Sequence, residues 1–130
     1  MEQKTILVID DDLGIRLMLQ KLLESAGYQV IIGEEGQSGL EAAWDHKPDL
    51  IISDMDMPIN NGYKTIEMFR NDPDVKAPVI IVSGVVDMRD AKLVLDAGAS
   101  AFFRKPVDQP ALLAKVSELL AAGPSAASDQ

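Results

Sequence analysis

The middle of the chain reads Leu50-Ile51-Ile52-Ser53-Asp54-Met55-Asp56-Met57-Pro58, an aliphatic run that ends abruptly in acidic residues. A short aliphatic run bounded by turn signals is typical of a strand that is buried on both faces of a sheet. Asp54 stands where this strand would emerge into a loop. Because burial of an uncompensated charge is costly, we expect a cation, a second acid or a basic side chain close to Asp54.

The rest of the chain alternates further strand-like runs with helical patterns. The additional strands are expected at Thr5–Ile9, Gln29–Ile32, Val79–Val82 and Ala101–Arg104. The expected helices are one that starts after Asp12, uses Ile15, Met18, Leu19, Leu22 and Leu23 and stops at Gly27; Glu35 to about His46, with Leu40, Ala43 and Trp44 inward; about Tyr63 to Arg70, with Ile66 and Phe69 inward; about Asp87 to Ala97, capped by Gly98; and a last helix lined by Leu112, Leu113, Val116, Leu119 and Leu120.

Five strands that alternate with five helices predict a single α/β domain, in which a parallel sheet carries helices on both faces. The length of 130 residues suits one domain with a core of its own. We assign residues 1–122 to this domain. Residues 123–130, which are rich in Ala and Ser, are expected to form a flexible tail or the start of a linker.

The composition disfavours several classes of partner. The formal net charge is −9, and binding to nucleic acid or to anionic lipid depends on clustered Lys and Arg. No apolar run approaches the roughly 18 residues that a membrane span needs, and the N-terminus does not resemble a signal peptide. We therefore expect a cytoplasmic protein that binds neither nucleic acid nor membrane directly.

Polar residues stand at the ends of four of the five strands: Asp10 and Asp11, Asp54, Ser83, and Lys105. In open parallel sheets, sites form beyond the carboxyl ends of the strands, where the strand order reverses. We therefore expect these residues to gather at one edge of the sheet. Asp12 is the better candidate for the N-cap of the first helix.

Three converging carboxylates predict a hard divalent cation, and Mg²⁺ suits them because it binds a few carboxylates while it retains water and accepts a phosphate oxygen. The chain has no cysteine and its one histidine, His46, lies elsewhere, so a zinc site is not expected. A carboxylate can also attack phosphorus to form an aspartyl phosphate. Asp54, at the centre of the sheet, is our candidate nucleophile.

Together these residues resemble the receiver domain of two-component response regulators. The matching motifs follow one another from the first strand to the last helix: Val8-Ile9-Asp10-Asp11, Ser53-Asp54-Met55-Asp56-Met57-Pro58 with Gly62, Val82-Ser83-Gly84, and Gly98-Ala99 followed by Lys105-Pro106. The resemblance implies a doubly wound, flavodoxin-like (βα)5 domain with strand order 2-1-3-4-5.

The resemblance also implies a role for each acid. Asp54 would accept a phosphoryl group from a phosphohistidine on a sensor histidine kinase or a histidine phosphotransfer protein. Asp11 would bind Mg²⁺ directly, Asp10 mostly through water, and Asp56 through its backbone carbonyl. The domain would not be an ordinary enzyme, since it would only catalyse its own phosphorylation and dephosphorylation.

The remaining residues of the motif would bind the phosphate and transmit its presence. Ser83 would donate its hydroxyl to a phosphoryl oxygen, and Gly84 would leave the path of attack open. Lys105 would pair first with Asp54 and then with the phosphate. The bond between Lys105 and Pro106 would be cis, as in the family.

The output implied by the resemblance is a change in the surface formed by the fourth helix, the fifth strand and the fifth helix. Phosphate would draw Ser83 inward and free space for the aromatic residue at position 102. The family often has tyrosine there, and Phe102 is expected to favour the inward rotamer already, which weakens the bias that phosphorylation supplies. A downstream effector would dock on this surface, and the domain would be a monomer or a weak dimer through it.

Three alternatives remain open from the residues. Asp54-Met55-Asp56 fits the Asp-x-Asp motif of haloacid-dehalogenase-type phosphatases, although those enzymes carry it on the first strand. A flavodoxin-like module that binds flavin is a second alternative, but Asp10-Asp11-Asp12 would repel the flavin phosphate. The third is a receiver that signals by binding alone, without phosphorylation. Trp44 and the six methionines are interpreted as packing residues, with Met55 and Met57 as candidate exceptions because they flank the site.

Overall fold

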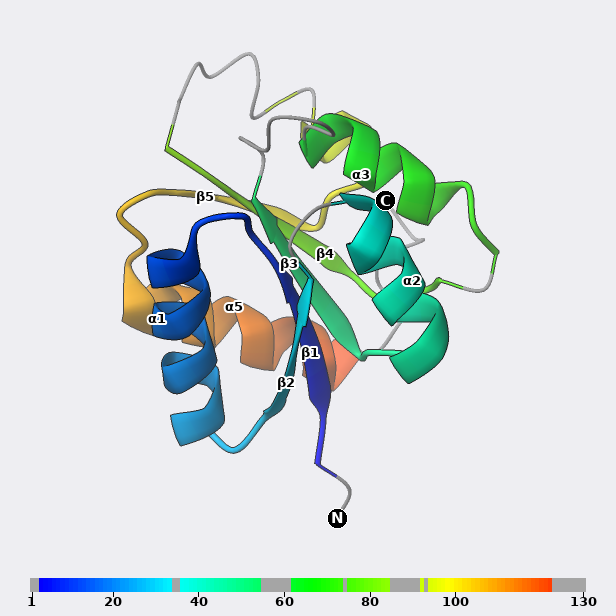
Figure 1. The fold of residues 1–130 in the computed structure, drawn as a ribbon. Coiled ribbons are helices and arrows are strands. Elements are labelled where there is room, and N and C mark those ends of the chain that lie inside the picture. Colours follow the sequence, from blue (N-terminus) through cyan, green and yellow to red (C-terminus); the bar gives the residue numbers. More distant parts are fainter. Residues whose placement is uncertain are drawn as a thin grey trace.

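The structure is a computed structural model that describes residues 3–33, 36–54, 62–73, 75–84, 92 and 94–122. Strands and helices alternate along these residues (Figure 1). In chain order they are β1 (Thr5–Ile9), α1 (Leu13–Ser25), β2 (Gln29–Gly33), α2 (Gly36–His46), β3 (Leu50–Asp54), α3 (Gly62–Arg70), β4 (Val79–Ser83), β5 (Ala101–Arg104) and α5 (Gln109–Ala122). Most of the helix expected from Asp87 to Ala97 lies outside the described residues. Within this range, the described residues 92 and 94–96 are helical.

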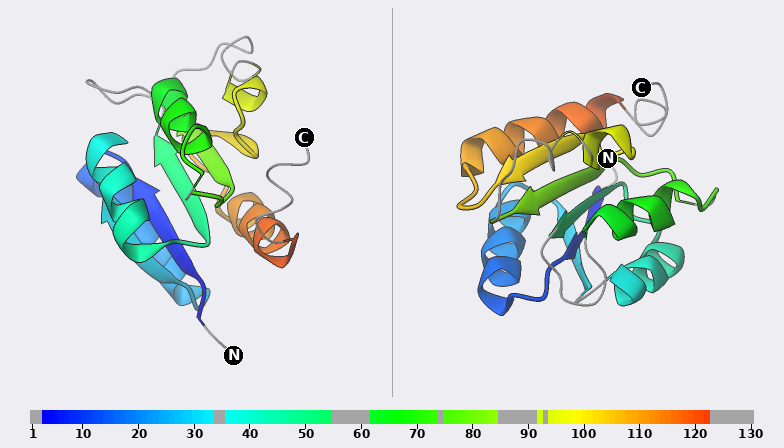
Figure 2. Two further views of the ribbon diagram at one scale, coloured as in Figure 1. Left: turned by 90° about the vertical axis from the view of Figure 1, so that its right-hand side faces the viewer. Right: turned by 90° about the horizontal axis from the view of Figure 1, so that it is seen from above.

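The five strands form one parallel sheet in the order β2-β1-β3-β4-β5, which confirms the predicted fold class. Helices α1 and α5 pack on one face of this sheet, and α2 and α3 pack on the other (Figure 2). β3 lies at the centre, with β1 and β4 as its neighbours. The end of β3 therefore lies between the ends of β1 and β4, in the middle of the carboxyl edge of the sheet.

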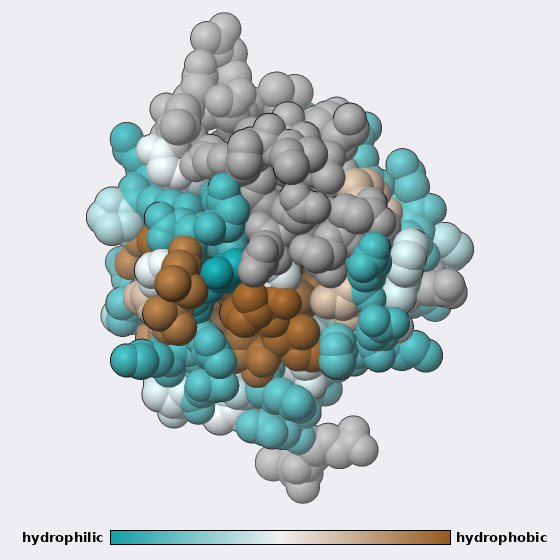
Figure 3. Space-filling model, in the orientation of Figure 1, coloured by the Kyte–Doolittle hydropathy of each residue, from teal (hydrophilic) through white to brown (hydrophobic). Residues whose placement is uncertain are grey.

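The buried residues divide between the two faces as strand geometry requires, since successive side chains point to opposite sides. Ile6 and Val8 of β1 lie in the core beneath α1 and α5, whereas Leu7 and Ile9 lie in the core beneath α2 and α3. All residues of β3 and of β4 are buried, which confirms that both strands are covered on both faces. The edge strand β2 is only partly buried, and apolar side chains remain visible over it (Figure 3).

Three local features fix where the helices begin and end and how closely they approach the sheet. Asp12 is the N-cap of α1, as predicted, because its carboxylate accepts a hydrogen bond from the main-chain N–H of Ile15 at 3.1 Å. Gly39 lets α2 approach β1 closely, since a Cβ at this position would lie 2.8 Å from Cγ1 of Ile9 and closer still to its Cδ1. α1 ends before Gly27, whose φ of 97° is one that glycine adopts readily.

The prediction that Trp44 points inward is wrong. Its side chain is 47% exposed, whereas its neighbour Ala43 is buried at 4%. Successive residues of a helix differ by about 100° in direction, so both cannot face the sheet. The small Ala43 occupies the contact with the core, and the indole N–H of Trp44 donates a hydrogen bond to the carboxylate of Asp72.

None of the helices in the described part of the chain combines the length and the apolar composition needed to cross a membrane. Residues 123–130, expected to form a tail or linker, lie outside the described residues.

Candidate functional site

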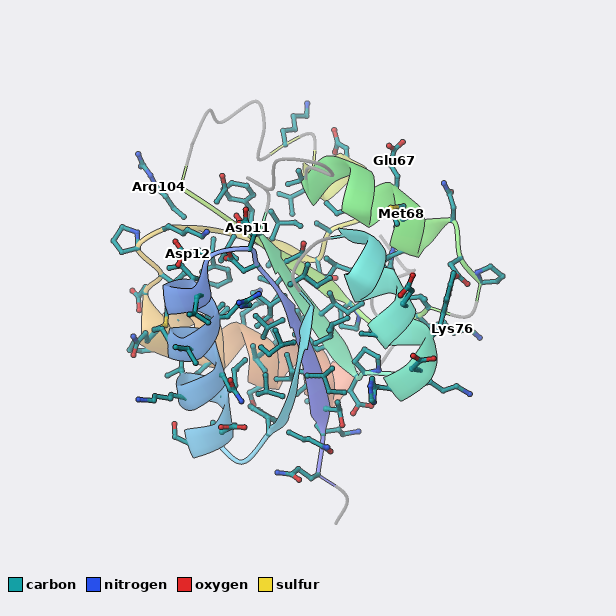
Figure 4. The ribbon with its side chains drawn as sticks, viewed as in Figure 1. Asp11, Asp12, Glu67, Met68, Lys76 and Arg104 are labelled. Atoms are coloured by element: carbon teal, nitrogen blue, oxygen red, sulfur yellow. The ribbon has the colours of Figure 1, made fainter. Side chains whose placement is uncertain are left out.

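The acidic residues that are distant in sequence meet at the carboxyl edge of the sheet. Asp10 and Asp11 follow β1, and Asp54 is the last residue of β3. One carboxylate oxygen from each of the three lies within 4.8 Å of those of the other two. Asp11 and Asp12 occupy the turn that connects β1 to α1 (Figure 4). The sheet order accounts for this arrangement, because β1 and β3 are hydrogen-bonded neighbours whose ends share one edge.

The three acids differ sharply in burial. Asp10 is 0% exposed and Asp54 is 2% exposed, whereas Asp11 is exposed to solvent. Two carboxylates at this depth need compensation by hydrogen bonds or by positive charge. Lys105, which directly follows β5, supplies part of it.

The ammonium group of Lys105 bridges the two buried acids. Its Nζ donates to Oδ1 of Asp54 at 3.1 Å and to Oδ2 of Asp10 at 3.2 Å. Burial opposes the charged form of Lys105, but the charges of Asp10 and Asp54 outweigh burial and raise the pKa of its ammonium group. The lysine therefore stays charged, and it contacts Asp10 as well as the expected partner Asp54.

Asp10 is held by the main chain as well as by Lys105. Its Oδ1 accepts a hydrogen bond from the N–H of Asp12 at 2.9 Å, and its own N–H donates to the carbonyl of Gly33 at 3.2 Å. Burial raises the pKa of the Asp10 carboxyl, and the charge of Asp54 adds to this effect, while the Asp12 N–H and Lys105 act against it. The charged form of Asp10 is therefore disfavoured, and a further cation nearby would stabilise it.

The other predicted residues lie near the same edge where they are described. Ser83 is fully buried at the end of β4, and its carbonyl accepts a hydrogen bond from the N–H of Lys105 at 2.8 Å. Gly84 follows it and is exposed. Phe102 of β5 is half-buried against the core beneath α2 and α3. The bond between Lys105 and Pro106 is cis. Asp56 lies outside the described residues.

Ser53, which lies directly beside the site, was given no separate role by the sequence analysis. Ser53 is 0% exposed, and its hydroxyl donates to the main-chain carbonyl of Asp54 at 3.2 Å. The signal was present in the sequence, since Ser53 is the single hydroxyl within the aliphatic run that leads to Asp54.

The donor set fits a hard divalent cation. Three carboxylates, two of them buried, offer oxygen ligands and an excess of negative charge over the single ammonium group of Lys105. Mg²⁺ prefers such ligands and keeps water in its remaining positions. The cluster is partly exposed to solvent through Asp11.

Comparison with known proteins agrees with this arrangement. A profile of the response regulator receiver domain matches residues 6–117. The chain is 34% identical over 117 residues to Protein PilH of Pseudomonas aeruginosa, a match that covers 89% of this chain and 97% of PilH. It is 37% identical over 111 residues to the transcriptional regulatory protein KdpE of Mycobacterium tuberculosis, covering 85% of this chain and 48% of KdpE. The chain thus spans about half the length of KdpE and of several other curated relatives that it matches.

The fold also matches that of solved structures. The crystal structure of a putative response regulator from Chloroflexus aurantiacus superposes with a TM-score of 0.87 at 28% identity, covering 92% of this chain and 99% of that one. These matches extend from β1 to α5 and favour neither the phosphatase nor the flavin-binding alternative. The chain therefore belongs to the response regulator receiver domain family of two-component signalling proteins.

Proposed function

We propose that this receiver domain accepts a phosphoryl group on Asp54 and that the phosphorylated form presents an altered surface to a partner. The observation that carries the proposal is the setting of Asp54. Its carboxylate is 2% exposed, lies beside two other acids and contacts the ammonium group of Lys105 at 3.1 Å. A carboxylate held in this way has a fixed orientation, and its partner Lys105 can also stabilise the negative charge of the phosphoryl group during transfer.

In the proposed reaction, a carboxylate oxygen of Asp54 attacks the phosphorus of a phosphohistidine. The new O–P bond forms as the P–N bond breaks, and the imidazole nitrogen keeps the electron pair of the broken bond and takes up a proton. Lys105 stabilises the negative charge of the transferring group, and we assign the hydroxyl of Ser83 to a phosphoryl oxygen. Gly84 leaves the approach to phosphorus unobstructed.

Asp10, Asp11 and Asp54, together with the main-chain carbonyl of Asp56, are the residues that we assign to Mg²⁺. The ion, when bound, would neutralise charge on the phosphoryl group and help to align it with the carboxylate. Asp11 is the exposed member of the cluster and is assigned as a direct ligand. Asp10, whose two oxygens already accept hydrogen bonds from Asp12 and Lys105, is assigned to act mostly through water.

The phosphoryl donor in this proposal is a sensor histidine kinase or a histidine phosphotransfer protein, and the partner that binds the phosphorylated domain is a downstream effector protein or domain. The domain is not a conventional enzyme in this proposal, because it catalyses only its own phosphorylation and dephosphorylation. The output surface comprises β5, α5 and the helix that precedes β5, where the ring of Phe102 and the hydroxyl of Ser83 would respond to phosphate. Any dimer is expected to be weak and to use this same surface.

The proposal is tested by incubating the protein with phosphoramidate and Mg²⁺ and measuring its intact mass. The wild type should gain one phosphoryl group, and addition of EDTA should suppress the gain. Asp54→Asn should gain none, whereas Asp45→Asn, a change of an exposed acid on α2, should behave as the wild type. A phosphoryl group retained by Asp54→Asn would move the acceptor to another residue. Steady hydrolysis of small phosphate esters would instead favour the phosphatase alternative.

A further inference from the structure

Among the described residues, Ser53 lies beside the site and has a buried hydroxyl to which the proposed chemistry gives no role. Ser53 pairs in register with Ile9 of β1 and is flanked by Ile81 of β4. Both neighbours belong to the aliphatic core beneath α2 and α3. Because side chains alternate along a strand, Ser53 points toward this core, as Ile51 does, while Asp54 points to the opposite face.

A hydroxyl in such surroundings is costly unless it forms a hydrogen bond, and an aliphatic residue would fill the space better. Among the described residues, the hydroxyl of Ser53 has one hydrogen-bond partner, the main-chain carbonyl oxygen of Asp54 at 3.2 Å. The two side chains lie on opposite faces of β3, so Ser53 reaches the acceptor residue only through this carbonyl.

We propose that Ser53 is a positioning residue for the phosphoryl-acceptor site. The carbonyl that it holds belongs to the peptide unit that follows Asp54. The orientation of this unit fixes the last backbone dihedral of Asp54 and thereby the direction in which its chain continues. On one side of the unit is the Cα of Asp54, which bears the acceptor side chain. One hydrogen bond thus restrains the main chain from which the carboxylate assigned to Mg²⁺ projects.

This inference rests on the proposed function of Asp54. It predicts that loss of the Ser53 hydroxyl changes the affinity for Mg²⁺ and not only the stability of the fold. Groups that orient metal ligands without touching the metal typically change metal affinity by about 10-fold to 100-fold when they are removed. We expect Ser53→Ala to weaken Mg²⁺ binding by about 10-fold, the lower end of that range, because the restraint acts through the main chain. Binding of beryllium fluoride in the presence of Mg²⁺ should weaken in parallel.

The chain offers a matched control in Ser100, which lies just before β5. Its Oγ is also buried but has no hydrogen-bond partner among the described residues. Ser100→Ala therefore removes a similar hydroxyl without removing a restraint on the site. Ser53→Cys serves as a second variant, because it keeps a group in the space of the hydroxyl, although sulfur is larger than oxygen, while the thiol is only a weak donor.

The experiment is calorimetric titration of the wild type and the three variants with MgCl2, beside urea unfolding of each protein without metal. The inference expects weaker Mg²⁺ binding by Ser53→Ala and Ser53→Cys, and wild-type binding by Ser100→Ala. If Ser53→Ala does not fold, Ser53→Cys carries the same comparison. Loss of stability with unchanged Mg²⁺ affinity in the folded Ser53 variants would overturn the inference and leave the hydroxyl a purely structural role. Absence of Mg²⁺ binding by the wild type would contradict the proposed function itself.

Discussion

Replacement of Asp10 by Asn tests two effects of the acidic cluster separately: the loss of folding stability that it causes without metal, and its contribution to Mg²⁺ binding. In Asp10→Asn, the amide oxygen can still accept the hydrogen bond from the N–H of Asp12, so the turn into α1 is retained. The charge is lost, and with it the ion pair to Lys105 and the repulsion from Asp54.

The magnitudes follow from the distances. Carboxylate oxygens of Asp10 and Asp54 lie within 4.8 Å, so their repulsion is about 3.5 kcal/mol or more at an effective dielectric constant of about 20. The Nζ of Lys105 lies 3.2 Å from Asp10, an attraction of about 5 kcal/mol on the same scale, but Lys105 keeps Asp54 as a partner in the variant. The attraction to Lys105 exceeds the repulsion from Asp54 by at most about 1.5 kcal/mol, and we expect the cost of burying the Asp10 charge to outweigh this difference. We expect Asp10→Asn to raise the free energy of unfolding by about 1 to 2 kcal/mol without metal.

The pH dependence has a definite sign. Because the pKa of Asp10 is raised in the folded state from its ordinary value of 3.8, the folded protein binds the proton more tightly than the unfolded chain. The contribution of Asp10 to stability therefore falls as pH rises from 3.8 through the raised pKa. The advantage of Asn should be present at neutral pH and vanish below pH 3.8, where Asp10 is protonated in both states.

Urea unfolding at pH 7 in EDTA and in MgCl2 measures these effects. At a Mg²⁺ concentration of ten times the dissociation constant, the ion should stabilise the wild type by about 1.4 kcal/mol. It should stabilise Asp10→Asn less, so the difference in unfolding free energy between the two proteins should narrow or reverse. An Asp10→Asn protein that is less stable than the wild type in EDTA, or a difference that Mg²⁺ leaves unchanged, would refute this reasoning.

Three further predictions test the surroundings of the site by thermal or urea unfolding. Lys105→Met should cost about 3 kcal/mol, the lower end for a broken buried ion pair because Lys105 is 17% exposed, and Mg²⁺ should restore part of it; an equal loss with and without Mg²⁺ would count against the cluster as a metal site. Gly39→Ala should cost about 1 to 3 kcal/mol because its Cβ would overlap Ile9, and the added change Ile9→Val, which removes Cδ1, should recover part of the loss; no recovery would place the strain elsewhere. Asp12→Ala should cost about 1 kcal/mol through loss of the cap of α1, whereas Asp12→Ser should cost little, and equal losses would argue against capping.

The sequence was sufficient for the fold because its strongest signals are local and agree with one another. Each of the five strands contains a short continuous run of apolar residues, and four of them are followed by or end in the polar residues that define the site. The hydrophobic pattern and the residues at the strand ends were therefore enough to predict the strands and the site. The family resemblance supplied the strand order, which local patterns do not contain. Asp12 was recognised as a cap because capping depends on only four consecutive residues.

The misses concern choices that depend on packing. Trp44 and Ala43 both fit an inward position on α2 in the sequence pattern, but only the smaller Ala43 is buried against the sheet. Ser53 was passed over because a single serine in an aliphatic strand gives no sign of which carbonyl it will contact. Lys105 was expected to pair first with Asp54, and only the geometry of three strand ends shows that Asp10 lies equally close.

The central claim, that Asp54 is the phosphorylated residue, is tested most directly by chemical trapping. Sodium borohydride reduces an aspartyl phosphate to homoserine, which marks the modified position in a peptide map. After incubation with phosphoramidate and Mg²⁺, homoserine should be found at position 54 and at none of the other aspartates. Homoserine at Asp10 or Asp11 with none at Asp54 would contradict the account.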